Sequence, residues 1–247
     1  MRPCIVIPHF DHVPQFQGML PKLVGLGIPL IVVDDGSPDS EYLSLQSLLH
    51  KEAKEAVLVR HRNNLGKGSA VMTGLRTALD SGYTHALQVD ADGQHDLRFL
   101  SNILEAAAAE PLALVCGEPV FDASISGLRK HARKITNVLC RLETLSSGIS
   151  DALCGFRVYP LAGIVPLDSI RMAHRMGFDP EILVRAYWAG IEVRYVSVGV
   201  SYPEDGRSHF RYFADNLEII WMHTRLLSGM LWRLPSLLRR RRKSGRD

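Results

Sequence analysis

The stretch THALQVDADGQHD (84–96) joins an apolar β-like run to a pair of acids and a glycine. Similar short apolar runs recur through the first half of the chain and alternate with segments of helical spacing. Strands that read as unbroken apolar runs are buried on both faces, so this alternation predicts a Rossmann-like α/β domain, a mostly parallel sheet with helices on both faces. The predicted strands are CIVIP (4–8), PLIVVDD (29–35), AVLVR (56–60), THALQVDAD (84–92) and LALVCGE (112–118), and the helices are 14–26, 39–52, 68–81 and 96–109.

The second half of the chain is less regular. Its patterns predict a helix over about 128–145, a strand over 152–160, a helix near 180–189 and a strand over 191–200. The chain has 247 residues, of which 46% are hydrophobic, and can therefore bury one large core. We expect one α/β domain over 1–208 and a distinct C-terminal segment over 209–247.

Charge and cysteine usage narrow the range of partners and compartments. The formal net charge is only +3 and the basic run 239–243 is local, so the rest of the chain is near neutral and we expect no nucleic-acid partner. Four well-separated cysteines with no CxxC pair predict reduced core residues. The N-terminal segment reaches Pro8 after three apolar residues in a row, too few for a secretory leader, so we expect a cytoplasmic protein.

Polar residues follow several of the predicted strands. Because ligands bind beyond the carboxyl ends of the strands in an open parallel sheet, these residues form the first candidate site. They are Pro8 to Asp11, Asp34 to Ser37, and Asp90 to His95.

Asp90 and Asp92 are the strongest candidates for a metal site. Two acids two residues apart on an extended segment project similarly, and Gly93 can turn the chain so that Gln94 or His95 approaches the same point. Mg²⁺ and Mn²⁺ take oxygen ligands from one or two carboxylates together with substrate phosphates. A solvated Asp-Gly turn explains DADG alone equally well.

Two further stretches could bind phosphate. NNLGKGSAVMTGL (63–75) places glycines and Lys67 at a helix start, although its spacing matches neither the P-loop nor the dinucleotide fingerprint. The segment 127–141 carries a cationic run that includes Arg129 and Arg133, and guanidinium groups suit phosphate. A simpler interpretation of 63–75 is an ordinary helix start, and a simpler interpretation of 127–141 is a solvated helix face.

Taken together, these motifs resemble the family-2 glycosyltransferases of GT-A fold, in particular the branch that transfers sugars to dolichyl or polyprenyl phosphate. The ordered set is more specific than any single motif. The matching motifs are the Ile7-Pro8 turn, VVDDGSPD (32–39), NNLGKGSAVMTGL (63–75), DADGQHD (90–96), DALCGFRVYP (151–160), GFDPEIL (177–183) and YPEDGRSHFR (202–211).

The resemblance implies a role for each matched residue. Asp34 or Asp35 would contact the nucleoside, with Pro8 and Lys67 also on the donor nucleotide. Asp90 would lie near the ribose and the metal, Asp92 would bind Mg²⁺ or Mn²⁺, and Gln94 would assist there. The chain departs from the family pattern at Phe10-Asp11-His12, at Cys154 and at Gly206-Arg207-Ser208-His209.

The implied reaction moves a sugar from a UDP- or GDP-sugar to an acceptor by direct, inverting attack. The metal, helped by Arg207 or His209, would stabilise the charge that develops on the leaving diphosphate. Asp151 is the candidate base for a hydroxyl acceptor. A phosphate acceptor, with a second pKa of about 6, needs no base, and Arg129, Arg133 and Arg157 then become its candidate ligands.

Two other classes of protein are compatible with these patterns. A sugar-phosphate nucleotidyltransferase would share the α/β domain and the metal, but its glycine-rich signature normally follows the first strand, where this chain has Pro8-His9-Phe10. A non-catalytic nucleotide-sugar binder or membrane-recruited scaffold would tolerate loss of the acids at 90 and 92, which are present here.

The segment 209–243 predicts an amphipathic helix on the membrane surface. Leu217, Ile220, Leu227, Leu231 and Leu234 recur on one face, and Pro235 is expected to end the helix and release the basic tail. Interrupting charges argue against a membrane span. We expect peripheral binding at the inner face of the cytoplasmic membrane and a lipid or lipid-linked acceptor. Packing of this helix on its own domain, or on a second copy in a homodimer, is the alternative.

Overall fold

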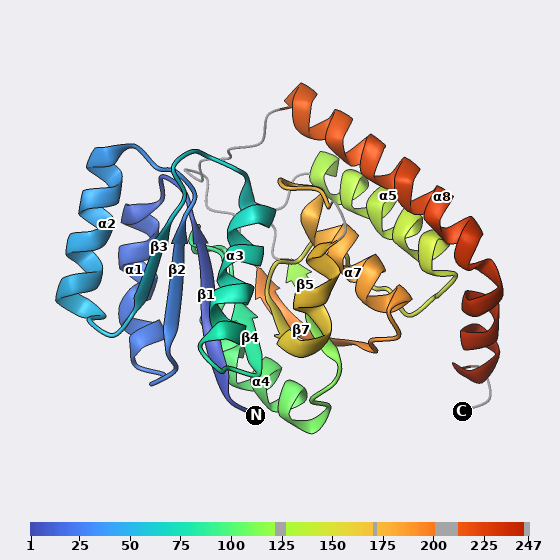
Figure 1. Cartoon of the computed structure of the whole chain (residues 1–247), viewed down its shortest axis with the longest axis horizontal. Coiled ribbons are helices and arrows are strands. Elements are labelled where there is room, and N and C mark those ends of the chain that lie inside the picture. Colours follow the sequence, from blue (N-terminus) through green and yellow to red (C-terminus); the bar gives the residue numbers. More distant parts are fainter. Residues whose placement is uncertain (122–126, 170–171, 201–211, 245–247) are drawn as a thin grey trace.

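The computed structural model describes residues 1–121, 127–169, 172–200 and 212–244; within these ranges the side chains of 128, 129, 169, 212 and 242–244 are not described. A single seven-stranded sheet runs through the molecule (Figure 1) in the order β3-β2-β1-β4-β6-β5-β7. The strands are β1 (Pro3–His9), β2 (Leu30–Asp34), β3 (Val57–Arg60), β4 (His85–Gln88), β5 (Leu114–Phe121), β6 (Arg157–Pro160) and β7 (Val193–Val200).

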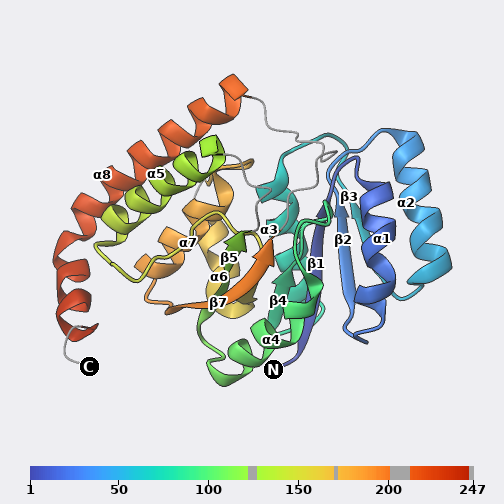
Figure 2. The ribbon, with the colours of Figure 1, turned by 180° about the vertical axis from the view of Figure 1, so that it is seen from behind.

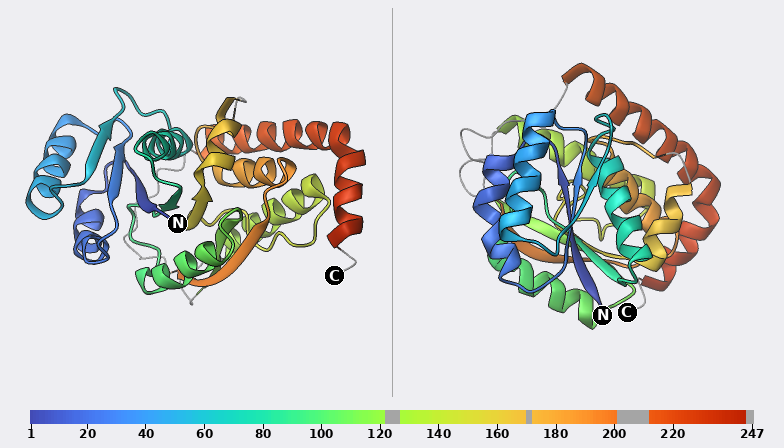
Figure 3. Two further views of the ribbon diagram at one scale, coloured as in Figure 1. Left: turned by 60° about the horizontal axis from the view of Figure 1, so that its bottom comes forward. Right: turned by 60° about the vertical axis from the view of Figure 1, so that its left-hand side comes forward.

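All neighbouring strands are parallel except at β6, which runs antiparallel to both β4 and β5. Helices cover both faces of the sheet, as the two further views show (Figure 3). The predicted architecture is therefore confirmed. The helices are α1 (Val13–Val24), α2 (Asp39–Glu52), α3 (Lys67–Asp80), α4 (Leu100–Ala109), α5 (Gly127–Thr144), α6 (Leu161–Ile164), α7 (Phe178–Trp188) and α8 (Tyr212–Ser244), with 3₁₀ turns at Leu97–Phe99 and Val165–Ser169.

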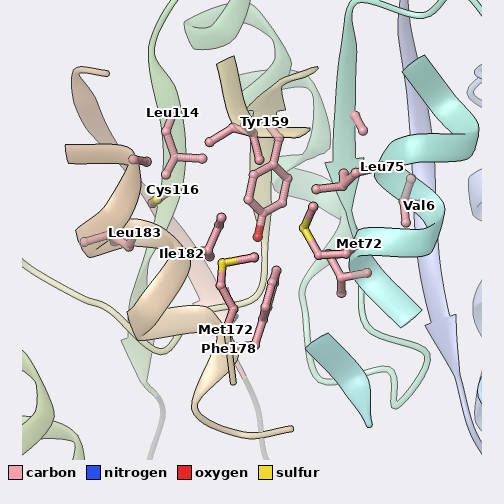
Figure 4. Packing of buried hydrophobic residues seen from close by; sticks show 14 of the residues in the cluster. Val6, Met72, Leu75, Leu114, Cys116, Tyr159, Met172, Phe178, Ile182 and Leu183 are labelled. Carbon is pink, nitrogen blue, oxygen red and sulfur yellow. The ribbon is translucent and has the colours of Figure 1, made fainter. Parts of the chain in front are cut away.

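Two hydrophobic clusters hold these layers together, one on each face of the sheet. The first packs α3, α6, α7 and α8 against the sheet, and Figure 4 shows Tyr159 of β6 in its centre, beside Met72 and Ile182. The second packs α1, α2 and α4 against the opposite face. All four cysteines are buried and unpaired, as the sequence predicts.

Helix α8 packs on its own domain, which is the alternative that the sequence leaves open, and it differs from its prediction at Pro235. Met222 and Leu226 belong to the first cluster, so α8 shares the core of the α/β domain. The helix also continues past Pro235, although the sequence predicts its end there. Its C-terminal part turns away from the direction of the rest of the helix (Figure 1). Contacts with the rest of the domain stabilise the helix beyond the proline, because Leu237 is buried and Arg240 donates to the carbonyl oxygens of Tyr187 and Ile191. In the part of the chain that the structure describes, no helix meets the length and hydropathy needed to span a bilayer.

Candidate active site

Asp34, at the end of β2, is fully buried and held by neighbouring groups. His9 Nδ1 lies 3.4 Å from its Oδ1, the Ser37 backbone N–H donates to Oδ2 at 3.3 Å, and Arg60 Nε lies 3.5 Å from Oδ2. Burial alone would raise the pKa of Asp34, but the hydrogen bonds from His9 and Ser37 outweigh it and lower the pKa. Asp34 is therefore an ionised group that joins the ends of the first two strands.

Asp35 shapes the glycine-rich loop. Its two oxygens accept the backbone N–H groups of Leu65 and Gly66 at 2.9 and 2.7 Å, and His61 Nδ1 lies 2.8 Å away. Gly66 has a φ of +103°, and a Cβ there would lie 2.4 Å from a carbonyl oxygen, so the loop requires glycine. Asp34 and Asp35, expected at the nucleoside, thus have protein partners for their oxygens, and Pro8 lies buried within β1.

Lys67, the first residue of α3, lies between two carboxylates. Its Nζ is 2.8 Å from Asp90 Oδ2 and 3.0 Å from Asp179 Oδ2. Gln88 Nε2 donates to Asp90 Oδ1 at 3.0 Å, and Tyr159 Oη in turn donates to Gln88 Oε1 at 2.8 Å. Burial would raise the pKa of Asp90, but the Lys67 charge prevails and lowers that pKa to about 2.

The acidic turn after β4 presents Asp92 differently from Asp90. Asp92 is half-buried, and its Oδ1 accepts the backbone N–H of Gln94 at 3.0 Å, while Oδ2 has no protein partner among the described residues. His95 follows this turn and packs against Phe156, with 5.2 Å between the two ring centroids. Burial opposes ionisation of His95, but a hydrogen bond with Cys154 and the charges of the two acids raise its pKa to about 9.

The turn 151–155, just before β6, closes the site from the other side. Gly155 must lack a side chain, because a Cβ there would lie 2.7 to 2.8 Å from Asp90 Oδ2, Gln88 Nε2 and Lys67 Nζ. Asp151 shapes this turn by accepting the backbone N–H groups of residues 153 and 154 at 3.0 and 2.8 Å. The sequence-predicted motifs 63–67, 90–95 and 151–155 are therefore brought together.

Arg157 is a correction to the sequence-based expectation. It was expected to bind an acceptor phosphate, but it is fully buried. Its guanidinium donates to the carbonyl oxygens of Cys154, Asp179 and Ala152 at 2.7 to 2.8 Å. The side chain therefore joins the turn 151–155 to the start of α7 and is withdrawn from the surface at which an acceptor would bind.

A basic surface hollow of about 370 Å³ lies beside Asp151, between α5 and the end of β5. Arg133 Nε and Nη2 bind the Asp151 carboxylate at 2.6 and 3.1 Å. Arg207, His209 and the side chain of Arg129 lie outside the described residues. The hollow is lined by Glu118, Pro119, Phe121, Lys130, Arg133, Lys134, Asn137, Val138, Arg141, Ser150 and Asp151.

Sequence reasoning missed the roles of Asp179, Gln88 and Tyr159. Asp179 has a side chain 9% exposed, and its Oδ1 is buried without a partner in the described structure, so it can accept a hydrogen bond from a ligand. The only sequence signal was its position in GFDPEIL (177–183). Gln88 and Tyr159 pair across β4 and β6, and an apolar run gives no indication of such a pair.

Comparison with known proteins agrees with this geometry. The chain is 28% identical over 220 residues to a dolichyl-phosphate beta-glucosyltransferase of Dictyostelium discoideum, covering 84% of this chain and 65% of that protein. It is 27% identical over 167 residues to polyprenol monophosphomannose synthase of Mycolicibacterium smegmatis, covering 64% of this chain and 61% of that protein. The chain therefore spans less than two thirds of the length of these two relatives.

Solved structures show the same GT-A fold. Glucosyl-3-phosphoglycerate synthase from Mycobacterium tuberculosis, in complex with Mn²⁺, UDP-glucose and phosphoglyceric acid, superposes with a TM-score of 0.64 at 18% identity, covering 94% of this chain and 79% of that one. Residues 4–160 match the family described as glycosyl transferase family 2. This match favours a glycosyltransferase over the nucleotidyltransferase and the non-catalytic binder. The chain belongs to glycosyl transferase family 2 and is a glycosyltransferase.

Proposed function

We propose that this enzyme transfers a sugar, with inversion, from a UDP- or GDP-sugar to the phosphate of a lipid such as a polyprenyl phosphate. The observation that carries the proposal is the Asp151 carboxylate, bound at two points by Arg133 beside the basic hollow. The relatives named as dolichyl-phosphate and polyprenol sugar transferases support this class of acceptor.

The pairing of Asp151 favours a phosphate acceptor over a hydroxyl. A hydroxyl must lose its proton to a base, and both oxygens of Asp151 already accept hydrogen bonds from Arg133. A phosphate monoester has a second pKa of about 6 and is already anionic at neutral pH. In our proposal Asp151 orients Arg133, and the neighbouring Lys130, Lys134 and Arg141 attract the acceptor phosphate to the hollow.

Among the described residues, no three His, Cys, Asp or Glu side chains converge on one point. Mg²⁺ and Mn²⁺ take one or two carboxylates, and the phosphates of the substrate complete their coordination. Asp92 Oδ2 suits such a metal, with Gln94 beside it. Both oxygens of Asp90 are bound by Lys67 and Gln88, which makes Asp90 the weaker metal ligand. When bound, the metal supplies Lewis-acid stabilisation of the departing diphosphate.

Lys67 and Asp179 complete the proposed donor site. The Lys67 ammonium lies beside the acidic turn, where it favours negative charge on a nucleotide. The unpartnered Asp179 Oδ1 can accept a hydrogen bond from a donor hydroxyl group. For the localisation, we propose peripheral attachment of α8 to the inner face of the cytoplasmic membrane, because α8 exposes an apolar row that includes Leu217, Ile220 and Leu231.

The test is a panel of UDP- and GDP-sugars incubated with a short-chain polyprenyl phosphate in detergent, with Mn²⁺, Mg²⁺ or chelator. We expect release of nucleoside diphosphate and formation of a lipid-linked sugar with at least one donor, both lost on chelation. Transfer to the corresponding polyprenol, but not to its phosphate, would contradict the proposed acceptor. Transfer that is unaffected by chelation would contradict the proposed metal.

A further inference from the structure

Helix α5 exposes a row of apolar side chains. Ile135, Val138 and Leu142 are 63%, 51% and 48% exposed. Their i, i+3, i+7 spacing places them on one side of the helix. Cys140, Glu143 and Thr144 occupy the opposite, buried side. The outer side of α5 therefore presents a continuous apolar row to solvent, within a segment that its sequence marks mainly as basic.

Helix α8 lies beside α5, as Figures 1 and 2 show from opposite sides. The two are joined by a buried contact between His223 Nδ1 and Glu143 Oε1 at 2.7 Å. The buried side of α8 carries Met222 and Leu226. Its outer side has the apolar side chains with the greatest exposure: Phe213 at 84%, Leu217 at 59%, Ile220 at 64%, Trp221 at 62%, Leu231 at 65% and Trp232 at 88%.

Cations border these apolar rows. Lys130, Lys134 and Arg141 lie on the side of α5 next to the apolar row, where they line the basic hollow together with Val138. Near the end of α8, Arg239 and Arg241 are exposed. Apolar rows edged by cations match a bilayer with anionic headgroups, because the apolar groups enter the acyl boundary while the cations meet phosphate. Two copies of such a face would repel each other through their like charges.

We propose that α5 and α8 together form one lipid-binding face, and that its occupant is the surface of a bilayer containing anionic lipid. Val138 belongs both to the exposed row and to the wall of the hollow, so the hollow opens at the edge of this face. The inference rests on the proposed function in one respect, that the hollow receives a lipid phosphate. Contact through α5 brings the hollow itself to the headgroups, which attachment through α8 alone would not do.

The test measures binding of the full chain to vesicles that contain no polyprenyl phosphate. The α5 variant carries Ile135→Ser, Val138→Ser and Leu142→Ser, and the matched control carries Leu26→Ser, Leu43→Ser and Leu112→Ser, three leucines exposed elsewhere. On phosphatidylglycerol-containing vesicles we expect the α5 variant to bind roughly tenfold more weakly or worse, and the control to bind like the unmodified chain. Replacing Lys130 and Lys134 by Gln should weaken binding about fivefold for each lysine, on anionic vesicles only.

A label provides a second readout that does not depend on folding of the triple variant. A polarity-sensitive dye on Val138→Cys should shift to the blue on anionic vesicles, whereas the same dye on Leu43→Cys should not. The native cysteines are buried and will not compete for the label. Equal vesicle binding by the α5 variant and its control, or no shift at position 138, would overturn the proposal.

Sedimentation velocity without lipid tests for a second copy. A dimer that the α5 variant converts to a monomer, with no vesicle binding by the unmodified chain, would make this face a protein interface and overturn the proposal. These experiments distinguish failure of the lipid-binding face from failure of the proposed function. Vesicle binding together with transfer to the polyprenol but not to its phosphate would refute the proposed acceptor alone. Transfer to the polyprenyl phosphate in detergent without vesicle binding would refute the lipid-binding face alone.

Discussion

Arg133 donates through Nε and Nη2 to the two oxygens of Asp151, at 2.6 and 3.1 Å. Both side chains are largely withdrawn from water, with 16% and 5% exposure. The same carboxylate also accepts backbone N–H groups from the turn that closes the site. Asp151 thus positions Arg133, which lines the basic hollow, and shapes the turn that lies beside Asp90, so it links the two parts of the candidate site.

Asp151→Asn should lower both stability and transfer. The substitution removes the carboxylate charge that Arg133 binds at two points, and we expect a loss of about 2–4 kcal/mol in the free energy of unfolding at pH 7, measured with urea. Asp39→Asn is the matched control, because Asp39 pairs with Arg60 at the surface with 88% of its side chain exposed. The interpretation fails if the two variants unfold at the same urea concentration.

Asp92→Asn should abolish metal-dependent transfer with little change in the fold. Its Oδ2 is the proposed metal ligand and supports no described contact, so we expect turnover to fall by about 10²-fold or more while the urea midpoint stays constant. Binding of Mn²⁺ in the presence of nucleoside diphosphate, followed by electron paramagnetic resonance, should weaken in parallel. Asp80→Asn, at the exposed end of α3, is the control and should retain both properties. Unchanged Mn²⁺ binding by the Asp92 variant would contradict the assignment.

Lys67→Met should destabilise the enzyme at neutral pH more than in acid. Without the ammonium, Asp90 and Asp179 face each other as poorly solvated carboxylates, at an expected cost of about 3 kcal/mol at pH 7. Protonation relieves this repulsion, so the difference from the unmodified enzyme should shrink between pH 7 and pH 4.5 in urea unfolding. Lys67→Arg retains the charge and should lose less. A pH-independent difference would show that the ion cluster is not its cause.

Asp34 should contribute to acid unfolding. Its folded pKa lies below the ordinary value of 3.8, so the folded state binds a proton less readily than the unfolded state. The stabilisation from this carboxylate is therefore fully present above the ordinary pKa and is lost as the pH falls below 3.8 through the folded value. We expect the unfolding free energy of Asp34→Asn to fall less steeply with pH in that range. Parallel curves for the two proteins would contradict this assignment.

A chain shortened to end at Ser208 should lose cooperative unfolding. Removal of α8 takes Met222 and Leu226 out of the first cluster, and it removes His223 and Arg225, which pair with Glu143 and Glu181. Calorimetry should show a much lower or absent thermal transition. A chain that ends at Ser244 keeps these contacts and should unfold like the full chain. A sharp transition at the original temperature in the Ser208 chain would show that α8 is dispensable for folding.

The sequence predicts the layered α/β fold because strands covered on both faces need unbroken apolar runs. It correctly places Asp34 and Asp90 near the ends of strands. It extends the fourth strand to residue 92, however, whereas β4 ends at Gln88. Apolar periodicity carries no strand direction, so the antiparallel course of β6 was not predictable. The Lys67–Asp179 contact joins residues 112 positions apart, beyond the reach of any local pattern.

Side-chain direction was the other gap in the sequence-based prediction. A motif places Arg157 near the site, but it does not reveal that the guanidinium turns inward to three carbonyl oxygens. Likewise, the amphipathic pattern of α8 is compatible with packing or exposure. The structure shows that the helix buries one side and exposes the other.

The reversed strand β6 also bears on the order in which the molecule assembles. In the sheet, β6 lies between β4 and β5 and pairs with both. The turn that carries Gly155 reaches Asp90 only when β6 enters this gap, and contacts between segments distant along the chain form after their loop-closure entropy has been overcome. The charged centre is thus a property of the completed sheet, and a nascent chain lacking residues 151–160 has no assembled site.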